Sequence, residues 1–223
     1  MQRDLDSLKR KILTMGSMVE ESTNMAISSL VDRRPELAYE VMQGDDAIDE
    51  LEVEIEEDCL KVLALHQPVA TDLRFVVAVM KVNNDLERMG DLAINIAERA
   101  SYLSTHDPLN VPLDYERMAT LSRDMVKQSL DAVVNLDTNL ARQVAAQDDE
   151  VDALNAEMFV VLQDRMREDP STVERAVHLL STSRHLERIA DLATNIAEDV
   201  VFMVDGEVVR HQLENYESKS EQE

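Results

Sequence analysis

One thirteen-residue segment occurs twice in the chain and decides its fold. Residues 86–98 read LERMGDLAINIAE, and residues 186–198 read LERIADLATNIAE. Ten of the thirteen aligned positions are identical at an offset of 100 residues. Internal similarity of this kind is typical of a duplicated structural unit. We therefore expect the two halves of the chain to fold in the same way.

The residues around both copies have the periodicity of α-helices. The first copy lies on a stripe of apolar residues that recur at intervals of three and four, namely Val79, Val82, Leu86, Met89, Ala93, Ile96 and Ala100. Similar stripes precede it and are interrupted at Pro35 and Pro68, since proline does not continue a helix interior. Four glycines, three phenylalanines and no tryptophan in 223 residues argue against a β-rich fold. The sequence predicts an all-α protein with three antiparallel helices in each half.

The segment 106–112 is the clearest linker, because it holds two prolines in seven residues. We expect a first three-helix bundle over residues 1–105, a second over 113–206, and a polar tail over 207–223 that frays. Acidic positions further upstream repeat at an offset of 103 rather than 100, so the last interhelical turn should be about three residues shorter than its counterpart. A single continuous six-helix core, or any sheet, would contradict this prediction of two bundles.

The charge of the chain excludes several classes of partner. With 22 basic and 46 acidic residues the formal net charge is −24, which repels nucleic acids and anionic lipids. The longest apolar run, residues 75–80, is far short of the roughly 20 residues that span a membrane. A single cysteine and an N-terminus without an apolar signal segment favour a cytoplasmic protein. Cations or basic protein surfaces are the partners that such a charge suits.

The repeated segment carries acidic residues on the helix face opposite its apolar stripe. At 100° per residue, Glu87, Asp91 and Asn95 fall on the outer face of the bundle rather than in its interior. Side chains four residues apart are neighbours about 5–6 Å apart at Cβ, so the two carboxylates repel each other unless a cation lies between them. Hard or borderline cations accept carboxylate and amide oxygens. Glu187, Asp191 and Asn195 repeat the pattern, which predicts one metal site in each half.

The preceding helix is also acidic, with nine Asp or Glu among residues 45–58. Asp49, and Asp152 in the second half, could complete a metal site from this neighbouring helix. The rest of its acidic stripe favours a solubilising face; in the first half that stripe is Asp45, Asp49, Glu52 and Glu56, and in the second Asp148, Asp152, Asn155 and Phe159. Only the first two of these four positions stay acidic in both halves.

Recognisable catalytic motifs are missing from the sequence. The five histidines form no pair at metal-ligand spacing, and the chain has neither a glycine-rich phosphate loop nor a nucleophile elbow. Arg88 and Arg188 are most simply interpreted as partners of Asp91 and Asp191 at a spacing of three. These features favour a protein that is not an enzyme. A metal-dependent enzyme that activates water at its carboxylates, and a metal-free helical adaptor, stay open as alternatives.

Residues 85–91 and 185–191, with Asn-Ile-Ala-Glu at 95–98 and 195–198, resemble the doubled signature of the PhoU family. Proteins of this family are accessory regulators of phosphate-specific transport. The resemblance covers nearly the whole chain and includes residues 45–52, 68–74 and 204–207. The chain departs from the pattern at Ala190, where the family usually has glycine; in a helix interior alanine should improve helicity.

The resemblance implies two three-helix bundles in a cytoplasmic protein that is often a homodimer. It also implies multinuclear metal clusters of iron, or of other metals such as zinc, nickel, manganese or magnesium. The implied ligands are Glu87, Asp91, Glu187 and Asp191, followed by Asp49, Asp152, Asn95 and Asn195, and then by Glu98 and Glu198. Finally, it implies a negative regulator of the phosphate-starvation response, with two partners: the ATPase subunit of the phosphate ABC transporter and the phosphate sensor histidine kinase.

Overall fold

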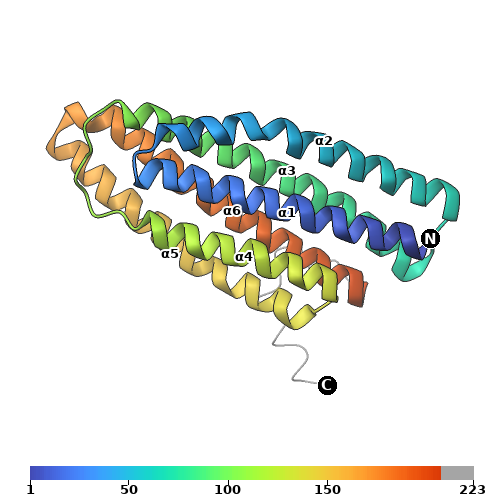
Figure 1. Cartoon of the computed structure of the whole chain (residues 1–223). Coiled ribbons are helices and arrows are strands. Elements are labelled where there is room, and N and C mark those ends of the chain that lie inside the picture. Colours follow the sequence, from blue (N-terminus) through green and yellow to red (C-terminus); the bar gives the residue numbers. More distant parts are fainter. Residues whose placement is uncertain (207–223) are drawn as a thin grey trace, which may run out of the picture.

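The structure is a computed structural model that describes residues 1–206, so the tail predicted over 207–223 lies outside the described residues. The described part is helical and contains no strand, which confirms the all-α prediction (Figure 1). Its elements are α1 (Gln2–Val31), α2 (Pro35–His66), α3 (Ala70–Ser104), α4 (Tyr115–Asn135), α5 (Thr138–Glu168), the 3₁₀-helix η1 (Pro170–Thr172) and α6 (Val173–Asp205).

The helices begin and end at residues suited to those positions. Pro35 occupies the first turn of α2, where its missing N–H costs no hydrogen bond. The side chains of Asp114 and Asp137 cap α4 and α5 by accepting hydrogen bonds from backbone N–H groups of the first turn. Gly206, with φ of 76°, ends α6 in the left-handed conformation that glycine favours.

Between the second and third helices, the second half is shorter than the first by the three residues that the change of offset predicted. The connection after α2 comprises residues 67–69, whereas Asp169 alone separates α5 from η1. In addition, α5 has 31 residues and α2 has 32. These differences together bring α3 and α6 into register at an offset of 100.

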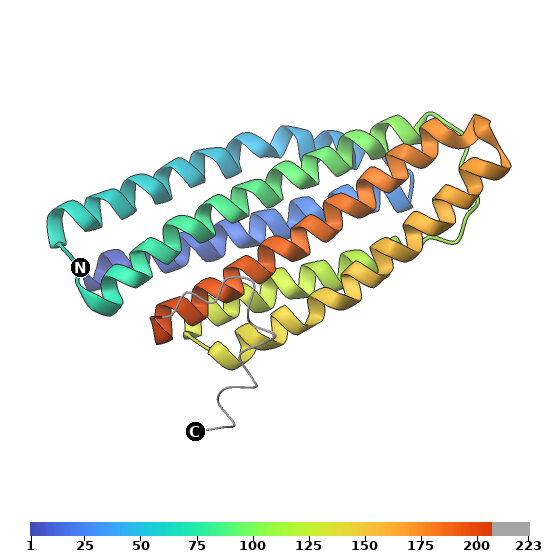
Figure 2. The same ribbon diagram turned by 180° about the vertical axis from the view of Figure 1, so that it is seen from behind.

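Each half is a bundle in which all three helices pack against one another. The two bundles lie side by side, with α3 against α6 and α1 against α4. The helices α2, α3, α6 and α5 form one layer, and α1 and α4 form a second layer against it (Figures 1 and 2). The prediction of two three-helix units is confirmed.

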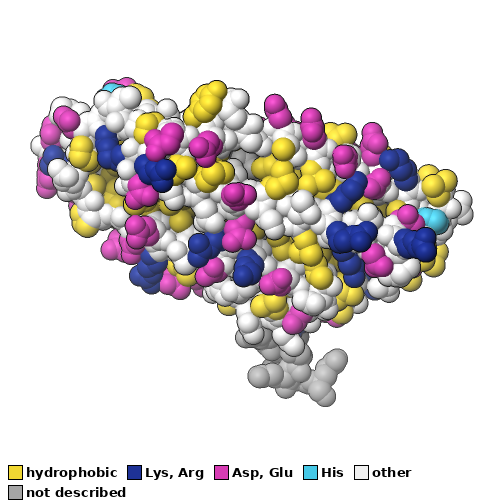
Figure 3. All heavy atoms as spheres, viewed as in Figure 1, with side chains coloured by type: hydrophobic (Ala, Val, Ile, Leu, Met, Phe, Trp, Pro, Cys, Tyr) yellow, Lys and Arg dark blue, Asp and Glu magenta, His cyan; other side chains and the backbone are white. Residues whose placement is uncertain are grey.

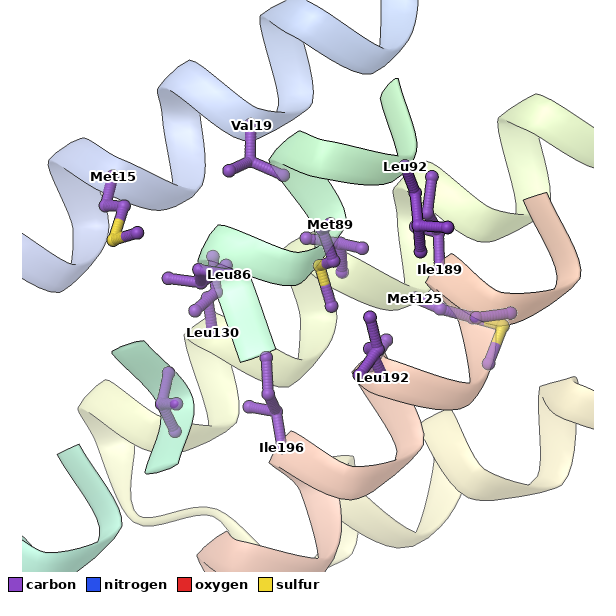
Figure 4. Packing of buried hydrophobic residues seen from close by; sticks show 14 of the residues in the cluster. Met15, Val19, Leu86, Met89, Leu92, Met125, Leu130, Ile189, Leu192 and Ile196 are labelled. Atoms are coloured by element: carbon purple, nitrogen blue, oxygen red, sulfur yellow. The ribbon is translucent and has the colours of Figure 1, made fainter. Parts of the chain in front are cut away.

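The buried side chains of the two bundles nevertheless form one continuous cluster that draws on all six helices. Met89 and Leu92 of α3 belong to the same cluster as Ile189 and Leu192 of α6 (Figure 4). The two three-helix bundles are present, but the expectation that a continuous six-helix core would be incompatible with them is wrong. The reason is that α3 and α6 bury apolar side chains on more than the one face that a separate bundle would need.

The contact between α1 and α4 depends on a glycine. A Cβ added at Gly16 would lie 2.2 Å from Cδ1 of Leu130, far inside van der Waals contact. Glycine thus allows the α1 backbone to approach the side chain of Leu130 at the junction of the halves.

Of the helices in residues 1–206, none is long and apolar enough to cross a membrane.

Candidate metal centres

The repeated motifs place their carboxylates at equivalent positions on α3 and α6. Asp91 and Asp191 are exposed, while Glu87 and Glu187 are half-buried. The preceding residues of the two motifs, Leu86 and Leu186, are fully buried in the core. The outer-face prediction is confirmed for these four acidic residues; α2 and α5, which pack beside α3 and α6, account for the partial burial of the glutamates.

In the first half the motif meets the acidic stripe of α2. We call these residues the first cluster: Asp45, Asp49, Glu52, Glu87 and Asp91. Burial raises the pKa of Glu87, and the negative charges of the other four members raise it further. Burial also raises the pKa of Asp45, with Asp49 and Asp91 adding to the effect. Every neighbouring charge that shifts these two carboxyl groups is negative, so the cluster is an uncompensated concentration of negative charge.

In the second half the motif meets the stripe of α5. We call these residues the second cluster: Asp148, Asp152, Glu187 and Asp191. Burial raises the pKa of Asp148 to about 7, and the charges of Asp191 and Asp152 contribute further. Burial likewise raises the pKa of Glu187 and Asp191, but Arg188 acts in the opposite direction on both. This cluster is more buried than the first and is partly compensated by arginine.

Two oxygen atoms of α5 beside these residues are buried without a hydrogen-bond donor. They are Oδ1 of Asp148 and Oδ1 of Asn155, and neither has a partner within residues 1–206. Leaving a buried acceptor unsatisfied costs about 1–3 kcal/mol. A bound cation would satisfy such oxygens, so the donor chemistry of the second cluster fits a metal.

The carboxylates do not converge on a common point as the side chains stand. Within residues 1–206, no group of three or more His, Cys, Asp or Glu side chains is arranged to hold a metal ion. Asp49 and Asp91 nevertheless both lie close enough to Glu87 for their charges to act on it, and Asp152 acts in the same way on Glu187 and Asp191. Their role as ligands stays a prediction.

The remaining predicted site residues behave differently in the two halves. Asn95 donates a hydrogen bond from Nδ2 to the backbone oxygen of Asp91 at 2.7 Å, which leaves its Oδ1 as an acceptor. Asn195 lines a cavity between α3 and α6 together with Asn95. Glu98 is exposed and pairs with Arg99, whereas Glu198 is buried. Glu198 therefore departs from the predicted outer ridge, because it lies in the groove where α6 packs against α3.

The interpretation of Arg88 as the partner of Asp91 is wrong, whereas the charge of Arg188 acts on Asp191 without an ion pair between the two side chains. Nη1 of Arg88 lies 3.7 Å from Oδ1 of Asp85, one turn in the other direction. Neither arginine forms an ion pair with the aspartate of its own motif in the described part of the chain.

Sequence reasoning placed Asp45, Glu52, Asp148 and Asn155 on a solubilising face and so missed their proximity to the motifs. A signal was present, since Asp45 and Glu52 precede and follow Asp49 by one helical turn and share its stripe. Asp148 keeps its acidic character at the offset of 103 as well.

The fold and these sites together define a class: all-α proteins made of a duplicated three-helix unit with an acidic cluster on each copy. The family model of the PhoU domain matches this chain twice, over residues 12–100 and 115–200. The chain belongs to the PhoU family.

Individual relatives are similar over almost the whole chain. A protein of Aquifex aeolicus named phosphate-specific transport system accessory protein PhoU homolog is 41% identical, over 94% of this chain and 95% of the relative. The crystal structure of PhoU from Pseudomonas aeruginosa matches with a TM-score of 0.88 at 36% identity, covering 92% of this chain and 99% of that one. The phosphate transport system regulatory protein PhoU from Streptococcus pneumoniae matches with a TM-score of 0.84 at 28% identity, with coverages of 93% and 98%.

Proposed function

We propose that this chain is a metal-binding accessory protein of a phosphate transport system that restrains the phosphate-starvation response. The observation that carries the proposal is the presence of two carboxylate clusters at equivalent positions on the two halves. The names of the relatives support the regulatory part, since they are accessory or regulatory proteins of phosphate transport. The same names favour a protein that is not an enzyme.

Glu87, Asp91 and Asp49 would hold metal in the first half, and Glu187, Asp191 and Asp152 in the second. Asp45, Glu52 and Asp148 would join them, and Asn95 and Asn195 would add amide oxygens one turn beyond the aspartates. The all-oxygen donor set suits iron, manganese or magnesium better than a soft metal, and the number of carboxylates allows a multinuclear iron cluster. Bound metal would cancel the repulsion within each cluster and draw its side chains together.

The charge of the chain indicates what kind of surface a partner presents, and the resemblance to the PhoU family supplies the candidates. With a net charge of −24, the chain favours a basic surface on its partner, and association should weaken as salt rises. The cytoplasmic ATPase subunit of the phosphate ABC transporter and the phosphate sensor histidine kinase are the partners that we propose, with the chain acting in the cytoplasm as a homodimer. In this account metal acts by fixing the face that a partner recognises.

Complementation of a deletion strain tests this function. Expression of phosphate-starvation genes is measured in phosphate-rich medium in strains that carry no copy of the gene, the wild type, or a variant with Glu87, Asp91, Glu187 and Asp191 changed to Ala. A matched control changes four exposed acidic residues outside the clusters to Ala, namely Glu21, Glu40, Glu116 and Asp131. We expect the genes to be switched on by the deletion and by the cluster variant, and to stay off in the control.

Two outcomes would contradict the proposal in different ways. If the deletion leaves the genes off in phosphate-rich medium, the regulatory function is wrong. If the cluster variant stays folded, loses its metal and still restrains the genes fully, metal has no part in signalling and a metal-free helical adaptor explains the protein better. Circular dichroism and elemental analysis of the purified variant identify the second case.

A further inference from the structure

A cavity of about 310 Å³ lies between α3 and α6, the two helices that run side by side at the junction of the halves (Figure 2). It is lined by the same four positions on each helix, related by the offset of 100: Arg88, Asp91, Leu92 and Asn95 on α3, and Arg188, Asp191, Leu192 and Asn195 on α6. Two arginines and two asparagines from equivalent positions thus border one cavity that is open to solvent, and both arginines are exposed. Neither acidic cluster provides such a set of donors by itself.

Among residues 1–206, few protein groups accept hydrogen bonds from the two arginines. Within residues 1–206, neither Arg88 nor Arg188 makes a side-chain hydrogen bond. Arg88 forms one long ion pair, with Asp85 at 3.7 Å, and Arg188 forms none. A guanidinium presents five donors in a planar fork that matches carboxylate and phosphate oxygens. Two such forks at one cavity form a typical arrangement for an anion with several oxygens.

The charge of the lining decides when an anion can enter. Arg88 and Arg188 contribute two positive charges, and Asp91 and Asp191 contribute two negative charges, so the bare lining is neutral. The same two aspartates belong to the first and second clusters. Metal held at those clusters would neutralise them and leave the arginines in excess. Anion binding should therefore be strong when metal is present and weak when it is absent.

We propose that the cavity between α3 and α6 binds one tetrahedral oxyanion, held jointly by Arg88 of the first half and Arg188 of the second. The proposal rests on the metal sites of the proposed function. An anion held in this way would tie the two metal-loaded halves together at their junction. Inorganic phosphate is the probe that we choose from this class, because its four oxygens accept hydrogen bonds from both guanidinium forks.

The experiment measures metal and phosphorus in the same sample. The full chain is dialysed against buffer with low concentrations of Mn²⁺ and inorganic phosphate, and elemental analysis gives both contents relative to a protein-free chamber. The test variant is Arg88→Gln with Arg188→Gln. The matched control is Arg123→Gln with Arg167→Gln, which makes the same charge change at arginines that do not line the cavity. Circular dichroism checks that all variants are folded.

We expect one phosphate per metal-loaded chain in the wild type and in the control. The test variant should keep its metal, and each lost arginine should weaken phosphate binding about tenfold or more, as expected for hydrogen bonds to charged groups. Metal without phosphate in the wild type, or phosphate retained in the test variant, would overturn the anion site alone. A wild-type chain that takes up no metal would overturn the metal sites and this inference together. The metal content of the wild type therefore distinguishes failure of the metal sites from failure of the anion site alone.

Discussion

The two halves of the molecule agree in their cores and differ in their acidic clusters. Leu86 and Leu186 are both fully buried at equivalent positions. By contrast, the first cluster has five carboxylates, and the charges of the other four all raise the pKa of Glu87. The second cluster has four carboxylates, and there Arg188 lowers the pKa of Glu187 and so opposes the effect of its neighbours. Asn84 of the first half is replaced by Arg184 in the second, and this arginine also acts on Glu187. The comparison shows that packing constrains the inner face of the repeat more tightly than its outer face.

The packing of Gly90 against Ile48 shows the same constraint on the inner face, because two size changes at the equivalent positions of the second half offset each other. A Cβ added at Gly90 would lie 3.3 Å from Cδ1 of Ile48, which is tighter than ordinary contact. In the second half the helix has Ala190 instead, and the residue equivalent to Ile48 is the smaller Val151. Compared with the first half, the second half has one carbon fewer on its second helix and one more on its third helix. The packed volume at this contact therefore stays nearly constant.

Truncation of the equivalent leucines should have the largest effect on stability. Because both side chains are fully buried, we expect Leu86→Ala and Leu186→Ala each to lower the free energy of unfolding by about 2–5 kcal/mol. Urea denaturation measures the change, with Leu60→Ala, at a half-exposed position of α2, as a control that should cost far less. A large difference between the two leucine variants would show that the cores are not equivalent.

The junction between α1 and α4 should be nearly as sensitive. In Gly16→Ala the new methyl group would displace Leu130, which should destabilise the protein by about 1–3 kcal/mol. Gly44→Ala is the matched control, because a Cβ at Gly44 meets no atom within 4 Å. It should stabilise α2 by up to about 1 kcal/mol through helix propensity. Thermal unfolding compares the two; equal shifts would mean that the halves do not pack closely at Gly16.

The difference between the clusters predicts a pH dependence. Folding raises the pKa of Asp148 from 3.8 to about 7, so its ionised form weakens the metal-free fold above pH 7, and this penalty fades as the pH falls towards 4. With allowance for the partial exposure of Asp148, we expect Asp148→Asn to stabilise the metal-free chain by about 1–2 kcal/mol at pH 8 and hardly at pH 4.

Asp45→Asn is the matched change in the first cluster. It should give a smaller gain, because burial acts less strongly on Asp45 than on Asp148. Chemical denaturation in the presence of a chelator at several pH values measures both variants. A gain for Asp148→Asn that does not depend on pH would show that its charge is not the cause.

The smallest effect concerns the exchanged methyl group. Ile48→Val removes a methylene and should cost about 0.5–1.5 kcal/mol in the wild-type background. In a Gly90→Ala background the new methyl group fills part of that space, so the cost of Ile48→Val should fall by about 0.5 kcal/mol or more. A double-mutant cycle measures this coupling. Additive effects would show that the two positions do not compensate each other.

Much of this architecture could be predicted from the sequence, because the repeat and the periodic apolar stripes report directly on helices. The continuous core could not, since helical periodicity shows which residues of a helix are apolar and not which helix they contact. The approach of α1 to α4 at Gly16 is an example: a glycine in a helix interior does not identify Leu130 as its neighbour.

The acidic site residues on the motif helices α3 and α6 were predicted from the sequence. Several of those on the neighbouring helices α2 and α5 were not. Glu87 and Asp91 were found because their spacing repeats at an offset of 100. Asp148 was missed as a site residue because its raised pKa depends on burial between α5 and α6, which composition does not reveal. The burial of Glu198 was missed for a similar reason, since the contact of α3 with α6 was not foreseen.

The central claim is that the two clusters are separate and equivalent metal sites, and metal stoichiometry tests it most directly. The chain is purified without chelators or a metal-binding affinity tag and its metal content is measured by elemental analysis, for the wild type and for the control variant with Glu21, Glu40, Glu116 and Asp131 changed to Ala. We expect Glu87→Ala with Asp91→Ala to halve the bound metal, and the further changes Glu187→Ala and Asp191→Ala to abolish it. An unchanged metal content in the fourfold cluster variant would contradict the account and show that the acidic clusters are solvated surface.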